Sequence, residues 1–65
     1  MQVLINQQPH DLPQGATLAD AVNAIQASGP FAAAVNLRFV PRTQYTQTAL
    51  AEGDQIEIIA PVTGG

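Results

Sequence analysis

Few side chains in this sequence could do acid–base or nucleophilic chemistry. The one histidine is His10, and cysteine is absent. Nucleophilic catalysis needs a serine or cysteine beside a base, and a metal site needs several clustered ligands. Asp11 and Asp20 are too isolated to form an acid–base pair, and no glycine-rich loop with a lysine is present to hold a phosphate. We therefore expect no catalytic residue, no metal and no cofactor, and no enzyme that acts alone.

The carboxylate that follows Gly64-Gly65 is the remaining reactive group. Two residues without side chains can thread a narrow channel into the active site of another protein. ATP could activate the carboxylate there as an acyl-adenylate, and a sulfur donor could displace AMP to leave a thiocarboxylate. A diglycine alone is a weak signal, because a frayed terminus can end in the same two residues.

The composition restricts the partners. Only 11% of the residues are charged, lysine is absent and the net charge is −3. Nucleic-acid binding needs clustered lysine and arginine, so we expect no nucleic acid, whereas a mildly acidic surface suits a basic groove on a protein. No stretch approaches the roughly 20 apolar residues that span a bilayer, and no signal segment follows Met1. We expect one cytoplasmic domain with no membrane contact.

A hairpin is predicted at the beginning of the chain. Alternation in residues 2–6 predicts a strand whose Leu4 faces away from the core. Residues 7–9 are typical of a turn, and residues 10–12 predict a short returning strand.

An amphipathic helix should follow this hairpin. Thr17 is a suitable N-cap, and the charge of Asp20 favours the first helical turn. Residues 28–30, Ser-Gly-Pro, predict the end of the helix. Its apolar stripe consists of Leu18, Ala21, Val22 and Ile25.

The second half of the sequence predicts short strands. Residues 31–35 predict a buried strand, and a turn and another short strand follow. Residues 41–48 predict a loop with one irregular turn. A tight turn at residues 52–54 should lead into the last strand, 55–60, in which Ile59 faces outward.

These elements predict an α+β domain over residues 1–60, in which one main helix packs across a mixed four- to five-stranded sheet. Pro61 cannot donate to a ladder, and Gly64 and Gly65 have no side chain to anchor them. Residues 61–65 are therefore predicted to leave the fold as a flexible tail.

Several motifs distributed along the chain accompany the diglycine. Together with the opening residues 1–6 and the length of the chain, they resemble the ThiS family, the sulfur carriers of thiamine thiazole synthesis. The resemblance runs from Met1 to Gly65. The motifs are Val35-Asn36, Val40-Pro41-Arg42, Tyr45, Leu50, Gly53-Asp54-Gln55-Ile56 and Pro61-Val62-Thr63-Gly64-Gly65.

The resemblance implies a ubiquitin-like β-grasp fold and a defined cycle. An E1-like, ThiF-type enzyme would adenylate Gly65 with ATP, and a cysteine desulfurase or another persulfide donor would supply sulfur for the thiocarboxylate. A ThiG-type thiazole synthase would take this sulfur. Val62, Thr63 and Gly64 would thread into the partner. The absence of cysteine is consistent with this cycle, since the chain cannot carry sulfur as its own persulfide.

A docking patch for the activating enzyme is expected on the outer side of the sheet. Leu4 and Ile59 should face outward on neighbouring strands, near the loop that carries Phe39. Arg42 belongs to the matched motif, and it could contact a partner or pair with a carboxylate, either that of Glu57 or that of Asp54.

Other functions remain open at this point. The small subunit of molybdopterin synthase also ends in diglycine and carries sulfur there. A binding module whose tail does nothing, or a protein modifier of the ubiquitin type, would have the same fold.

Overall fold

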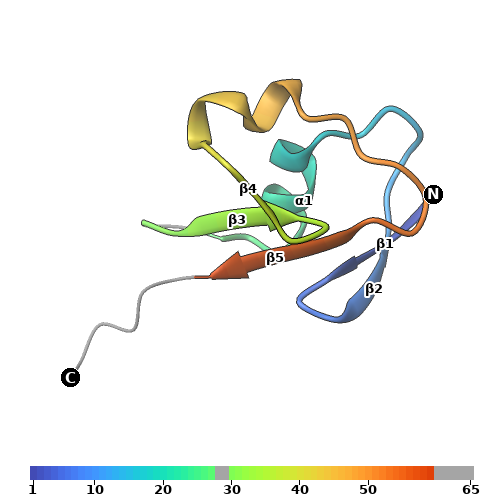
Figure 1. The fold of residues 1–65 in the computed structure, drawn as a ribbon. Coiled ribbons are helices and arrows are strands. Elements are labelled where there is room, and N and C mark those ends of the chain that lie inside the picture. Colours follow the sequence, from blue (N-terminus) through green and yellow to red (C-terminus); the bar gives the residue numbers. More distant parts are fainter. Residues whose placement is uncertain (28–29, 60–65) are drawn as a thin grey trace.

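Seven elements make up the described part of the chain, residues 1–27 and 30–59 of a computed structural model. The strands form one mixed sheet in the order β2-β1-β5-β3-β4, and the helices lie on one side of it (Figure 1). This arrangement confirms the predicted α+β layers. In chain order the elements are β1 (Gln2–Ile5), β2 (Gln8–Asp11), α1 (Leu18–Ala24), β3 (Ala32–Val35), β4 (Arg38–Val40), the 3₁₀ helix η1 (Arg42–Gln47) and β5 (Gln55–Ile59).

The last strand, β5, occupies the centre of the sheet. It runs parallel to β1 on one side and antiparallel to β3 on the other. β2 and β4 form the two edges, each paired antiparallel to the strand next to it. Because β5 is paired on both sides, its backbone is held more firmly than that of either edge strand.

Two tight turns form the hairpins. Asn6 and Gln7 join β1 to β2, and Asn36 and Leu37 join β3 to β4. All four residues have positive φ, with Asn36 at 51° and Leu37 at 69°. This is the backbone of type I′ turns, whose twist matches that of the paired strands. Asparagine adopts the left-handed region at lower cost than most residues, which suits the first position of each turn.

The position of the first turn corrects the sequence-based prediction. The turn lies at residues 6–7 rather than 7–9, so β2 begins two residues before His10. Pro9 is therefore a strand residue and lies opposite Leu4. β2 is an edge strand, and an edge strand tolerates proline because the missing N–H need not donate to a second neighbouring strand.

The helix α1 begins at the predicted residue. Thr17 is the N-cap, and its backbone N–H donates to Asp20 Oδ2 at 2.8 Å. The segment before β5 supports this start, since the Leu18 N–H donates to the Thr48 carbonyl at 2.9 Å. The short helix is thus fixed at its beginning by a cap and by a neighbouring segment.

The helix ends before the predicted stop at residues 28–30. Gln26 adopts the left-handed conformation with φ 58°, and its N–H donates to the Asn23 carbonyl at 3.0 Å. The Ala27 N–H donates to the Val22 carbonyl at 3.2 Å. These two bonds form a Schellman motif. The helix therefore ends next to a left-handed glutamine, a residue type that does not usually signal the end of a helix.

One apolar core lies between the helices and the sheet. As predicted, β5 alternates: Ile56 is 1% exposed, whereas Ile59 is 59% exposed. Instead of the predicted irregular turn, the 3₁₀ helix η1 forms, and its Tyr45 ring stacks on Phe31 with centroids 5.9 Å apart. The buried apolar residues are Val3, Ile5, Leu12, Ala16, Leu18, Ala21, Val22, Ala33, Val40, Tyr45, Leu50 and Ile56.

Candidate functional site

The sheet face opposite the helices carries large exposed apolar side chains. Phe39 on β4 is 70% exposed, and Ile59 at the end of β5 is 59% exposed. Phe39 lies opposite Ala34, and Ile59 lies opposite Ala32. The two alanines lie between Phe39 and Ile59 on the same face, so the apolar surface continues from one large side chain to the other. We call these four residues, Phe39, Ala34, Ala32 and Ile59, the outer apolar patch.

Leu4 lies on the same face but at a distance from this patch. In the parallel register of β1 and β5, Leu4 pairs with Gln55, four residues before Ile59. At about 3.3 Å per residue, that offset corresponds to roughly 13 Å along the strand. The structure therefore places Leu4 and Ile59 on neighbouring strands, as predicted, but towards opposite ends of β5.

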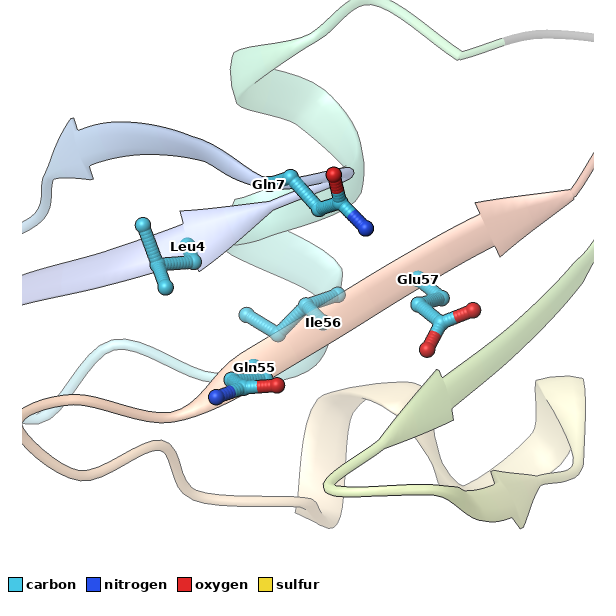
Figure 2. Close-up of a pocket in the computed structure, with 5 residues that line it drawn as sticks. All are labelled: Leu4, Gln7, Gln55, Ile56 and Glu57. Atoms are coloured by element: carbon cyan, nitrogen blue, oxygen red, sulfur yellow. The ribbon is translucent and has the colours of Figure 1, made fainter.

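A small pocket lies beside Leu4, where β1 ends and β5 continues (Figure 2). Leu4 and Ile56 contribute apolar atoms to its lining. Gln7, Gln55 and Glu57 contribute amide and carboxylate groups, so the pocket combines an apolar wall with hydrogen-bonding groups. Within the described ranges, the Glu57 carboxylate makes no hydrogen bond or ion pair with another side chain, although its backbone pairs with Ala34 of β3. This carboxylate gives the outer face a negative charge.

Arg42 lies at the start of η1, and its guanidinium group is 5.3 Å from the centroid of the Phe31 ring. This is a cation–π geometry, and Phe31 in turn stacks on Tyr45. The Asp54 carboxylate accepts hydrogen bonds from Asn36 Nδ2 at 3.0 Å and from the Ala51 N–H at 2.8 Å. The sequence gives no sign of either arrangement.

The last two described residues of β5 are each held by a contact with a neighbouring element. Ile59 pairs with Ala32 of β3. On the other side of β5, the Ile58 N–H donates to Asn6 Oδ1 at 2.9 Å. The predicted sulfur-bearing Gly65 and the predicted threading residues Gly64, Thr63 and Val62 lie outside the described residues. We refer to residues 60–65 as the C-terminal segment.

The two aspartates considered for acid–base chemistry make contacts that support the fold. Asp20 accepts from the helix N-cap, and Asp11 Oδ1 is 3.5 Å from the α-amine of Met1. Within residues 1–27 and 30–59, no group of three or more His, Cys, Asp or Glu side chains could hold a metal ion. No helix in these ranges is long and apolar enough to cross a membrane.

Known proteins with the same architecture identify the class of this chain. It superposes on the crystal structure of a thiamine biosynthesis protein (ThiS) from Geobacter metallireducens with a TM-score of 0.81, 17% identity and full coverage of both chains. A solution structure of a thiamine biosynthesis protein from the same organism gives a TM-score of 0.82 at 19% identity, and covers 100% of this chain and 88% of the other. The molecule is thus an α+β protein of the ubiquitin-like β-grasp class.

The sequence defines the family. The ThiS family model matches residues 3–65. The sulfur carrier protein ThiS of Escherichia coli is 33% identical over 66 residues, with full coverage of both chains. This chain belongs to the ThiS family of sulfur carriers.

Proposed function

We propose that this chain carries sulfur as a thiocarboxylate on Gly65 and donates it during thiazole formation in thiamine biosynthesis. The observation that carries this proposal is the family match, which extends through the diglycine to residue 65. The thiamine-related relatives support the same pathway. The chain acts as a protein co-substrate and supplies no catalytic side chain.

The cycle begins when the Gly65 carboxylate attacks the α-phosphate of ATP in a ThiF-type enzyme and releases pyrophosphate. A persulfide on a cysteine desulfurase, or on another donor, then attacks the acyl carbon and displaces AMP, which leaves an acyl disulfide. A protein thiol attacks the donor-side sulfur of this disulfide, so that the thiocarboxylate is released and a protein disulfide remains. The net change is one carboxylate oxygen exchanged for sulfur. A ThiG-type thiazole synthase consumes the product, and we assign the cycle to the cytoplasm because the activation step requires ATP.

The outer apolar patch is the proposed docking surface for the activating enzyme. Leu4, which lies roughly 13 Å from Ile59 along the strand direction, and Arg42, at the start of η1, are proposed as additional contacts. Two exposed large side chains joined by alanines form a continuous apolar surface, and such surfaces often mark interaction sites. Ile59 also directly precedes the C-terminal segment. A partner bound to this patch therefore lies close to the origin of Gly64 and Gly65.

Adenylation is tested by ATP–pyrophosphate exchange with a ThiF-type enzyme. We expect exchange that depends on this chain and disappears when Gly65 is removed. The Gly65-deleted chain must give the same circular dichroism spectrum and melting curve as the full chain. If a verified active ThiF-type enzyme exchanges pyrophosphate equally well without the chain, the carrier proposal is wrong.

A further inference from the structure

Asn6 makes two contacts with β5 at the point where β1 has already ended. Its backbone N–H donates to the Ile56 carbonyl at 2.8 Å. Its side-chain Oδ1 accepts from the Ile58 N–H at 2.9 Å. The strand pairing of β1 with β5 covers only Gln55 and Ile56. The asparagine side chain therefore extends the parallel ladder by one hydrogen bond after the β1 backbone has turned away.

The other hairpin repeats this arrangement at the opposite end of β5. The Asn36 N–H donates to the Gln55 carbonyl at 2.7 Å, and the Gln55 N–H donates to Asn36 Oδ1 at 3.0 Å. Like Asn6, Asn36 occupies the first position of a type I′ turn. β5 is thus held by one asparagine at its start, from the β3 side, and by another near its end, from the β1 side.

The residue type follows from two requirements. The first turn position needs a positive φ, which is 52° at Asn6, and asparagine tolerates this backbone. The bond to β5 needs a short side chain with an oxygen acceptor. Glycine satisfies only the first requirement, whereas aspartate satisfies both. These differences provide a matched set of variants.

We propose that Asn6 is a positioning residue, which fixes the end of β5 and thereby the place and direction in which the C-terminal segment leaves the sheet. This role rests on the proposed function, because the segment must deliver the Gly65 carboxylate to the activating enzyme. Asn6 does not touch the reacting atoms. It acts through Ile58, which is separated from the C-terminal segment by Ile59 alone.

We call the hydrogen bond from the Ile58 N–H to Asn6 Oδ1 the clamp, and hydrogen exchange of the free chain measures it directly. In Asn6→Gly, we expect the Ile58 amide to exchange about two- to tenfold faster, the effect of one lost hydrogen bond. The Glu57 amide, which alternation directs towards β3, should keep its rate. Asn6→Asp should restore protection of Ile58. Equal acceleration at Ile58 and Glu57 would instead indicate general destabilisation and would overturn the clamp.

Activation kinetics test the positioning role. With the wild-type chain, a ThiF-type enzyme and ATP, pyrophosphate exchange is measured across a range of carrier concentrations. In Asn6→Gly we expect kcat to fall about two- to tenfold while KM stays within twofold, because the docking surface is intact and the carboxylate is delivered less often. Asn6→Asp should recover most of kcat.

Asn36→Gly is the matched control, since it removes the equivalent clamp at the far end of β5. It should lower the melting temperature at least as much as Asn6→Gly but leave kcat within twofold of wild type. If Asn6→Gly activates like wild type, or if Asn36→Gly loses kcat equally, Asn6 has no positioning role. Absence of activation with the wild-type chain itself would instead refute the proposed function.

Discussion

Phe39 and Ile59 expose large apolar side chains on strands that otherwise alternate regularly. Phe39 is 70% exposed, and the next residue, Val40, is buried because it points to the other face of the sheet. Isolated apolar residues are ordinary on protein surfaces. Here Ala32 and Ala34 connect the two side chains on one sheet face, which makes them a candidate contact surface and not two unrelated exceptions.

Ile59→Asp should weaken docking without unfolding the chain. A buried charge in a protein interface leaves an unpaired, desolvated group, so we expect KM for a ThiF-type enzyme to rise about tenfold or more. The measurement is pyrophosphate exchange at varied carrier concentration. Gln14→Asp adds the same charge at an exposed polar position away from the sheet, and it should leave KM within twofold. Equal KM values for both variants would contradict the docking assignment.

Gly53 occupies a position that requires a left-handed backbone conformation. Its φ is +84°, and a Cβ built on it meets nothing within 4 Å. Gly53→Ala should therefore lower the free energy of unfolding by about 1 kcal/mol through backbone strain alone. Gly53→Asn should cost less, because asparagine tolerates the left-handed region. Urea denaturation measures both, and an alanine variant as stable as wild type would contradict this explanation.

At the scale of elements, the capped helix start is the feature that the sequence predicted best. Thr17 and Asp20 have the residue types and spacing of a reciprocal cap, and the structure confirms the position. The helix end was predicted wrongly, because Gly29 and Pro30 are the conventional stop signals whereas the chain turns left-handed at Gln26. Tertiary packing decides such an end, and a single sequence does not contain that information.

The two hairpins show the same limit. Apolar alternation predicted the first and last strands and their inward faces, including Ile56 and the outward Ile59. The apolar run at residues 31–35 was wrongly predicted to be buried throughout, because Ala32 and Ala34 lie on the outer face. It did not predict that Asn6 begins the first turn, since Gln7 and Pro9 look equally typical of a turn. The clamp of Asn6 on Ile58 joins residues 52 positions apart in the chain. Such a contact depends on β1 and β5 being neighbours, which composition and periodicity do not specify.

Asp20→Ala should destabilise the domain by removing the acceptor for the Thr17 N–H. We expect a loss of about 1 kcal/mol in the free energy of unfolding. Asn23→Ala lies on the exposed side of the same helix and should be neutral or slightly stabilising, because alanine has the higher helix propensity. Denaturant titration of both variants decides the matter. Equal effects would show that the cap contributes nothing beyond propensity.

At the scale of the whole molecule, stability depends on a small core. A chain of 65 residues buries only about 60% of its unfolded surface, and cysteine is absent. Ile5, Leu18, Ile56 and Val3 are the largest fully buried side chains. The central strand β5 thus has two functions: Ile56 anchors the core on one face, and Ile59 faces outward beside the C-terminal segment.

Ile56→Ala should cost about 2–5 kcal/mol, a large share of the stability of a domain this small. Ile56→Val should cost about 0.5–1.5 kcal/mol, and Ile59→Ala on the opposite face about 0.5 kcal/mol or less. Chemical denaturation gives all three values. Similar losses for Ile56→Ala and Ile59→Ala would contradict the assignment of the two faces of β5.

The central claim is that Gly65 carries sulfur, and the intact mass of the chain tests it most directly. The chain is incubated with ATP, a ThiF-type enzyme and a persulfide donor, and its mass is compared with that of a chain lacking Gly65. We predict a mass gain equal to one oxygen exchanged for one sulfur, confined to the full chain and dependent on ATP. An unchanged mass with verified active enzymes, or the same gain in the shortened chain, would contradict the claim.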